Sequence, residues 1–255
     1  MKASRPDPYQ EIARYYDAEN ADLVEDLAAY ELLSERFGGP VLDVGCGTGR
    51  VALYLAEQGF TVTGIEASAT MLDRVRAKPG IERVKVVEGS IAEAKIDDSF
   101  GLAMLAFSTF QHFHTQEEQV KALTNIAWHL RPGGGVALDL SNPVHFFRTD
   151  DVPALVHERT FPDPDSGQPV MQQSIVRADR AAQILHITWV YDRIEVGGSI
   201  TRTVCEMPLR CYTAPEIRLL LERVGFSPVE FYGTYDFDPF DEHSPRLFVV
   251  AEKAS

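Results

Sequence analysis

The stretch Leu42-Asp43-Val44-Gly45-Cys46-Gly47-Thr48-Gly49-Arg50 decides the fold, because it joins a short apolar run to a helical segment through a glycine-rich loop. The apolar run begins at Val41, and the helical segment extends from Arg50 to Gln58 and ends at Gly59. Glycine lets the backbone turn sharply and approach a ligand closely, and the start of a helix offers free N–H groups and the positive end of its dipole. The stretch therefore predicts a strand, a ligand-binding loop and a helix, in that order.

The loop departs from the dinucleotide-binding fingerprint at one position. That fingerprint, G-x-G-x-x-G/A, requires a small residue where this chain has Arg50, and arginine cannot supply the close packing of helix against strand. What remains is a Gly-x-Gly-x-Gly loop with an acid, Asp43, two residues before its first glycine. This pattern disfavours an NAD-dependent oxidoreductase, which stays open as an alternative.

A carboxylate follows the next predicted strand at a separation that suits a ribose. The run from Thr61 to Ile65 predicts a strand, and Glu66 at its end lies 21 residues after Gly45. A carboxylate at this separation accepts hydrogen bonds from ribose hydroxyls and repels a 2′-phosphate. The ligand is therefore expected to contain an unphosphorylated ribose.

Strands and helices alternate as far as residue 140, which predicts a Rossmann-like, doubly wound parallel sheet covered by helices. Asp7 and Gln10 resemble a capping box, so an N-terminal helical stretch is expected to begin there. A turn at 131–135 is expected to end the helix that follows residue 115. The other elements expected here are a helix at 69–76 and strands at 84–87, 102–107 and 136–140.

The pattern changes after Pro143. Residues 185–191 and 203–211 alternate as strands do, on either side of a Gly197-Gly198 turn, which predicts an antiparallel sheet inserted into the α/β unit. A helix that starts after Thr213 and strands at 229–235 and 247–251 are expected to follow. The predicted organisation is therefore N-terminal helices and a ligand-binding α/β core in 1–154, an inserted antiparallel sheet in 155–212, and the last helix and strand pair in 213–255.

Composition argues against several classes of protein. The chain has 24 basic and 38 acidic residues and a net charge of −14, so no nucleic-acid partner is expected. No apolar run approaches the roughly 20 residues that span a bilayer, and the N-terminus lacks the apolar stretch of a secretory signal. We therefore expect a cytoplasmic protein without a membrane partner. The three cysteines, Cys46, Cys205 and Cys211, have neither disulfide-framework nor zinc-site spacing, and no metal is expected.

With these features in register, the sequence resembles the class I S-adenosylmethionine-dependent methyltransferases. The resemblance rests on Asp43–Gly49, on Glu66 and on the Leu130–Gly134 turn, and the α/β frame from 41 to 140 and the end of the chain from 213 to 251 fit as well. It implies a mostly parallel, seven-stranded sheet in which the last-but-one pair is reversed. It also implies S-adenosylmethionine as the cofactor, lying across the carboxyl ends of the first, second and fourth strands.

The resemblance also implies a set of cofactor-binding residues. Asp43, Gly45 and Gly47 would lie along the methionine part, and Glu66 would bind the ribose. Where the family commonly has an acid after the third strand, this chain has Ser90, so that contact with the adenine departs from the pattern. The complete expected set is Tyr16, Asp43, Gly45, Cys46, Gly47, Glu66, Ala67, Met71, Ser90, Ile91 and Phe107.

Methyl transfer to a small-molecule acceptor requires positioning more than covalent catalysis. Histidine is the usual proton acceptor at neutral pH, and His112 follows the fourth predicted strand, so it is the catalytic candidate. A pocket-lining role for His112 is the alternative. Arg202 and Arg210 are candidates for binding the diphosphate of a nucleotide-linked sugar, and the inserted sheet is a candidate homodimer face. The sequence leaves N or O as the acceptor atom open, and a non-catalytic cofactor-binding module also remains an alternative.

Overall fold

A seven-stranded sheet forms the centre of the molecule. The computed structural model describes residues 7–148 and 154–254. The strand order is β10-β11-β5-β4-β1-β2-β3, with β11 antiparallel to both of its neighbours and the other pairings parallel. This confirms the predicted fold class, and the reversed element is the single strand β11. The strands are β1 (Val41–Val44), β2 (Val62–Glu66), β3 (Val84–Glu88), β4 (Phe100–Leu105), β5 (Leu130–Ser141), β10 (Phe226–Tyr232) and β11 (Arg246–Lys253).

Two apolar clusters cover the two faces of this sheet. In β4, Ala103 and Leu105 join one cluster while Leu102 and Met104 join the other, as expected of a strand whose successive side chains point to opposite faces. The first cluster lies under α5 (Gln116–His129) and α7 (Ala214–Arg223), and the second under α2 (Leu27–Phe37) and α3 (Arg50–Glu57). The remaining short elements are α4 (Ala69–Arg76), η1 (Ile81–Arg83), η2 (Thr109–His112) and α6 (Pro143–Arg148).

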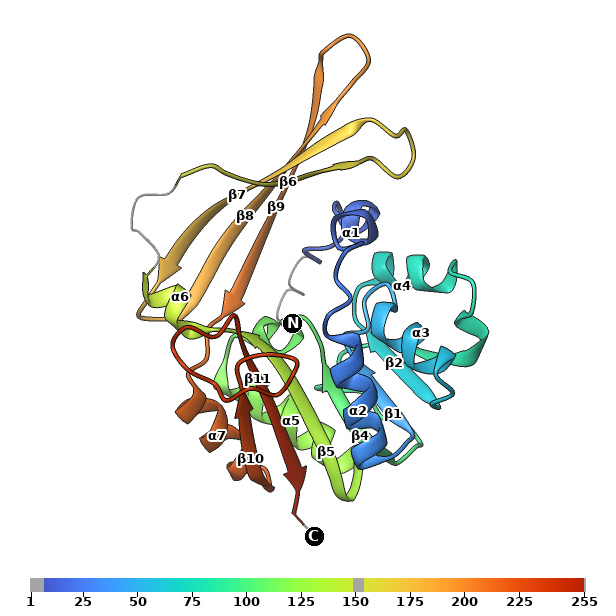
Figure 1. Cartoon of the computed structure of the whole chain (residues 1–255), viewed down its shortest axis with the longest axis vertical. Helices are drawn as coiled ribbons and strands as arrows, with labels where there is room; N and C mark the ends of the chain where they lie inside the picture. The colour runs from blue at the N-terminus through green and yellow to red at the C-terminus, as the bar shows by residue number, and fades with distance from the viewer. Residues whose placement is uncertain (1–6, 149–153, 255) are drawn as a thin grey trace.

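A second sheet, which we call the upper sheet, stands over the carboxyl edge of the first (Figure 1). Its strands are β6 (Val156–Pro162), β7 (Pro169–Asp179), β8 (Ile184–Ile194) and β9 (Ile200–Arg210), all antiparallel and in that order. Gly197 and Gly198, both with positive φ, form the turn between β8 and β9. The predicted antiparallel sheet is therefore confirmed.

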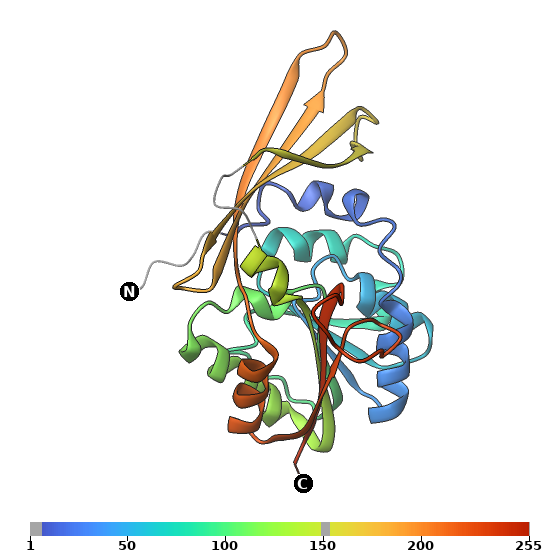
Figure 2. The same ribbon diagram turned by 60° about the vertical axis from the view of Figure 1, so that its left-hand side comes forward.

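Helix α1 (Ala13–Glu19) lies between the two sheets, next to α4 on one side and β6 on the other (Figure 2). The predicted start of the N-terminal helix was wrong. The Asp7 carboxylate accepts hydrogen bonds from the Tyr9 N–H at 2.9 Å and from the Ser68 hydroxyl at 2.6 Å, so it ties the chain to α4 and caps no helix. The polar segment around 20–26 then separates α1 from α2.

Two strand boundaries also differ from the sequence pattern. Strand β5 begins at Leu130 and β10 at Phe226, several residues earlier than expected. The glycines before Val136 suggested a turn, but a Cβ on Gly135 would lie 2.5 Å from the ring of Phe37, so glycine there lets β5 pass beneath α2. Within the described residues, no helix is long and apolar enough to cross a membrane.

Candidate active site

The glycine loop connects β1 to α3 at the carboxyl edge of the seven-stranded sheet. Gly45 and Gly47 have φ values of 70° and 56°, a left-handed backbone that favours glycine. A Cβ on Gly45 would lie 2.5 Å from Cγ2 of Thr109, so the loop packs tightly against the segment that follows β4. A Cβ on Gly47 would meet no atom within 4 Å, so the other side of the loop is open. The loop thus leaves room for a ligand at Gly47.

Glu66, at the end of β2, is bonded directly to this loop. Its Oε2 accepts the Gly47 N–H at 2.8 Å, and its Oε1 accepts the Ser68 N–H at 2.8 Å. Burial raises the pKa of this carboxyl group, whereas the backbone hydrogen bonds favour its charged form. Each oxygen has a second lone pair, so the carboxylate can accept ribose hydroxyls while it remains fixed to the loop.

Asp43 carries an acceptor without a partner. It is 2% exposed, and its Oδ1 is buried with no hydrogen-bond donor among the described residues. Burial raises the pKa of Asp43 to about 7. A buried polar atom without a partner in a native fold calls for an explanation. A cofactor with a donor group would supply the missing partner, so Asp43, the open side of Gly47 and Glu66 fit S-adenosylmethionine.

The other expected cofactor-binding residues differ in how far they are exposed. Met71 is buried in α4, whose first turn is capped by Ser68, and Ala67 before it is exposed. Ser90 Oγ accepts the Ala92 N–H at 3.3 Å and so caps its own turn. Ile91 is buried in the apolar cluster under α5.

The side chain of Cys46 packs away from the open side of the loop. A Cβ on Gly64 of β2 would lie 2.8 Å from its Sγ, so the thiol points at the sheet. Burial raises the pKa of this thiol well above its usual range. Cys46 can therefore meet a ligand in the loop through its backbone.

His112 lies at the end of η2, directly after β4, and faces the N-terminal segment. Its Nε2 is 3.1 Å from the hydroxyl of Tyr9, and the Tyr9 ring packs edge-on against Tyr16 with centroids 6.1 Å apart. Burial, together with His114, lowers the pKa of His112 to about 4, so this imidazole is neutral at pH 7. The sequence did not single out Tyr9, since its contact with His112 joins residues 103 positions apart.

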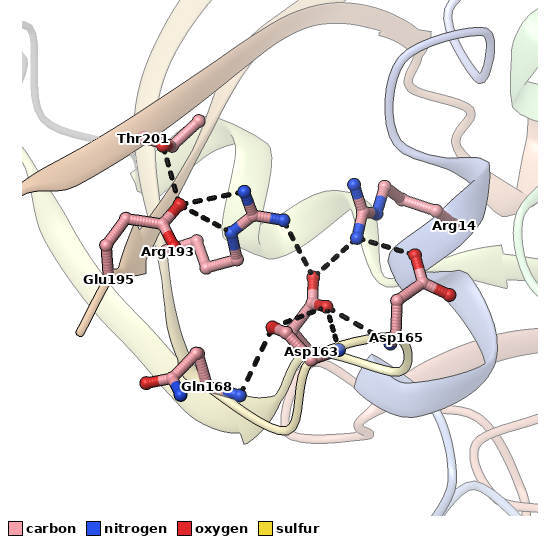
Figure 3. Close-up of polar contacts among 8 residues, drawn as sticks. Arg14, Asp163, Asp165, Gln168, Arg193, Glu195 and Thr201 are labelled. Atoms are coloured by element: carbon pink, nitrogen blue, oxygen red, sulfur yellow. Dashed lines mark hydrogen bonds and ion pairs between the residues drawn. The ribbon is translucent and has the colours of Figure 1, made fainter.

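Helix α1 connects the glycine loop to the upper sheet. On the loop side, Asp17 accepts hydrogen bonds from the Thr48 hydroxyl at 2.6 Å and from Lys78 Nζ at 2.8 Å. On the other side, Figure 3 shows Arg14 of α1 and Arg193 of β8 converging on Asp163, at 2.8 and 3.6 Å. The Asp163 side chain is fully buried, so two cations share one buried carboxylate at this junction.

A second buried carboxylate reinforces the same junction. Glu19, the last residue of α1, accepts hydrogen bonds at Oε2 from the Tyr191 hydroxyl at 2.8 Å and from Gln172 Nε2 at 3.0 Å. Burial raises the pKa of Glu19 to about 7, although the Tyr191 hydrogen bond and Arg159 oppose the shift. We call Arg14, Asp163, Arg193, Glu19 and Tyr191 the α1 junction.

Neither arginine considered for diphosphate binding is free of partners. Arg202 is bonded to both oxygens of Asp192, at 2.7 and 2.6 Å, and Arg210 is bonded to Glu216 at 2.6 Å and to Gln183 at 3.0 Å. Both guanidinium groups are neutralised within the chain. The structure therefore gives no support to the diphosphate prediction for these two residues.

Comparison with known proteins points to a methyltransferase family. A family model described as "Methyltransferase domain" matches residues 41–134. The chain is 33% identical to cypemycin N-terminal methyltransferase from a Streptomyces species, over 85% of this chain and 84% of that protein.

Solved structures agree over nearly the whole chain. The CcbJ methyltransferase from Streptomyces caelestis is 26% identical with a TM-score of 0.82, and the match covers 97% of this chain and 98% of that one. CalS10, an amino pentose methyltransferase from Micromonospora echinaspora solved with S-adenosylmethionine bound, has the same fold at 21% identity and a TM-score of 0.68, covering 92% and 90% of the two chains. The glycine loop, the acid on β2 and these relationships together place the chain in the class I S-adenosylmethionine-dependent methyltransferases.

Proposed function

We propose that this methyltransferase transfers a methyl group to an amine nitrogen of a small metabolite. The acceptor would lie between the carboxyl edge of the seven-stranded sheet and the upper sheet, beside Tyr9 and His112. The observation that carries the choice of nitrogen is the buried, neutral imidazole of His112 within hydrogen-bond distance of Tyr9.

The cofactor would be held at the glycine loop. We assign Asp43, Gly45 and Gly47 to the methionine part and Glu66 to the ribose. The bound cofactor supplies a methyl group that is already activated on a sulfonium. The other proposed contacts are Tyr16, Cys46, Ala67, Met71, Ser90, Ile91 and Phe107.

His112 would accept a hydrogen bond from the N–H of the amine that receives the methyl group. An imidazole with a pKa of about 4 is unprotonated at pH 7 but is a weak base. A hydroxyl acceptor benefits strongly from a good base, whereas a neutral amine already carries a nucleophilic lone pair and needs to be oriented. A weak hydrogen-bond acceptor in a fixed position, such as His112, therefore suits an amine better than a hydroxyl. In the tautomer that the proposal requires, Nε2–H would donate to the Tyr9 oxygen and Nδ1 would be the free acceptor.

The names of the relatives support an amine acceptor. Cypemycin N-terminal methyltransferase and an amino pentose methyltransferase are both named for amine substrates. For this chain we propose an amino-bearing small metabolite. Since Arg202 and Arg210 are both held by carboxylates, a nucleotide diphosphate group is not part of the proposal.

The proposal includes three further features of the whole protein. We propose a division into 1–154, 155–212 and 213–255, a cytoplasmic location, and a homodimer through the upper sheet. The buried, unpaired thiols of Cys46, Cys205 and Cys211 are typical of a reducing compartment. The dimer is supported by apolar side chains on that sheet that are about half exposed, namely Val156 at 51%, Ile200 at 54% and Val204 at 50%.

The test has two stages. Calorimetric titration with S-adenosylhomocysteine, with NAD as the control ligand, measures cofactor binding. Methyl transfer to a panel of small amines and matched phenols is then followed by mass spectrometry. We expect binding of S-adenosylhomocysteine alone and transfer to amines. In His112→Ala, we expect turnover to fall by about 10- to 100-fold through loss of orientation, while the affinity for S-adenosylhomocysteine stays unchanged. Transfer to phenols alone, or full activity in His112→Ala, would contradict the proposal.

A further inference from the structure

The turn after β4 has an unfavourable backbone at two successive residues. Phe107 and Ser108 have φ values of 44° and 68°, in the left-handed region, and neither is glycine. This conformation is costly for a residue with a side chain, so it persists only where the surroundings determine it. Such strain concentrates at functional sites, and this turn leads directly into η2, which carries His112.

One residue of β5 fixes both strained positions. Asp139 accepts the Phe107 N–H at its Oδ2, at 2.9 Å, and the Ser108 N–H at its backbone carbonyl, at 3.0 Å. Asp139 is 0% exposed, so these hydrogen bonds are shielded from water.

The Asp139 carboxylate accepts hydrogen bonds from β11 and from the segment before it. Arg246 of β11 donates from Nε to Oδ1 at 2.7 Å, and the Tyr235 hydroxyl donates to Oδ2 at 3.0 Å. The Arg246 guanidinium also lies 5.7 Å from the centre of the Phe107 ring and donates to Ser108 Oγ at 3.4 Å. Arg246 therefore contacts the carboxylate and both residues that the carboxylate constrains.

The turn also touches the glycine loop. Thr109, the next residue, packs its Cγ2 against Gly45 so closely that a Cβ there would lie 2.5 Å away. Its hydroxyl donates to the Ala106 carbonyl at 2.8 Å, which keeps the turn closed. The turn thus spans the gap between the loop that holds the cofactor and the helix that carries His112.

We propose that Asp139 and Arg246 are positioning residues for methyl transfer. They hold the strained turn of Phe107 and Ser108, and through it they set the place of His112 relative to the glycine loop. Neither residue is proposed to touch the cofactor or the acceptor. The inference rests on the proposed function for its kinetic consequence, but the clamp on the turn exists without any ligand and can be measured in the free protein.

The test uses the full chain with Asp139→Asn and Arg246→Lys. Both variants weaken the clamp, so we expect kcat to fall by about 10- to 100-fold, since a displacement near 1 Å has effects of this size. We expect affinity for S-adenosylhomocysteine by calorimetry to change much less than kcat. In the free protein, hydrogen exchange of the Phe107 and Ser108 amides should become faster.

A matched control separates positioning from general destabilisation. His129 is also a buried polar residue, and its Nε2 accepts the Ile96 N–H at 3.0 Å. His129→Gln should lower thermal stability without reducing kcat and without changing exchange at residues 107 and 108.

Removal of the strain gives the sharpest result. Glycine accepts the left-handed backbone, so Ser108→Gly added to Asp139→Asn should restore thermal stability and leave kcat low. Recovery of both quantities would show a merely structural role and overturn the inference. Faster exchange with unchanged kcat, in an enzyme that methylates amines, would overturn it too. If the wild type methylates no amine, the proposed function fails, and unchanged exchange in Asp139→Asn would separately show that the clamp is absent.

Discussion

The α/β core and the α1 junction are held together by different forces. The core buries two continuous apolar clusters on either side of a central sheet, and its strands β1 and β4 are buried along their whole length. In the α1 junction, two buried carboxylates, Glu19 and Asp163, make the polar contacts. A smaller apolar cluster, which includes Tyr15, Phe161 and Tyr191, packs beside them and is counted with the junction. The core therefore depends mainly on packing, whereas the junction should respond to pH and salt.

The largest difference is expected from the same substitution made in each region. Phe100 is completely buried in the core, and Phe161 of β6 lies in the cluster of the junction at 7% exposure. Phe100→Ala should lower the free energy of unfolding by about 3–5 kcal/mol. Phe161→Ala should cost less, about 1–2 kcal/mol, because β6 is an edge strand in a smaller cluster. Urea unfolding followed by circular dichroism measures both, and equal losses would remove the distinction between the two regions.

An intermediate effect is expected from the charge of Glu19. Its pKa is raised to about 7 in the folded state, so the folded protein holds this proton more tightly than the unfolded chain does. The contribution of Glu19 to stability therefore falls as the pH rises from about 4.5 to about 7, and stays low above that range. Glu19→Gln should be more stable relative to wild type at pH 8 than at pH 5, by about 1–3 kcal/mol.

Asp43 titrates in the same pH range. Its contribution cancels when the free energy of unfolding of the wild type is subtracted from that of Glu19→Gln at each pH. Urea unfolding at the two pH values supplies the measurement. A difference that is the same at pH 5 and pH 8 would show that Glu19 does not titrate in this range.

The smallest effect is expected from Arg14. It is one of two cations at Asp163, its side chain is 32% exposed, and Arg193 remains when it is removed. Arg14→Ala should lower the free energy of unfolding by about 0.2–1 kcal/mol, and less in high salt. The control is Lys85→Ala, which breaks an exposed ion pair with Asp98 on the surface of the α/β core. If both variants lose the same stability at low salt, the junction is no more charge-dependent than the surface of the core.

The sequence predicts this core better than the junction, for physical reasons. The loop from Asp43 to Gly49 and the acid at Glu66 are local patterns that lie close together along the chain. The β8–β9 hairpin was predictable because its alternation and its Gly197-Gly198 turn are also local. By contrast, α1 is short and has no side-chain cap at its N-terminus, so nothing nearby marks its start.

The candidate site was predictable only where its residues lie in a local sequence pattern. His112 could be identified because it follows a predicted strand, but Tyr9 could not, since only the folded chain brings the two together. The clamp at Asp139 joins residues 107 positions apart, and an acid in an apolar strand gives no indication of its partner. The early start of β5 was missed because glycines that permit close passage beneath Phe37 look the same in the sequence as glycines that form a turn.

The position of β11 has a consequence for synthesis of the protein. Among the strands described for this sheet, β11 is the last to be synthesised, yet it lies between β10 and β5 and supplies Arg246. On the ribosome, β5 must therefore wait with an unpaired edge until residues 246–253 have emerged, and such edges invite pairing with other chains. The glycine loop is made early, but the turn that precedes His112 gains its contact with Arg246 only after the other strands of the α/β core and the upper sheet have been synthesised. A chain stalled shortly before β11 would contain most of the fold but would lack the arginine that holds Asp139 and Ser108.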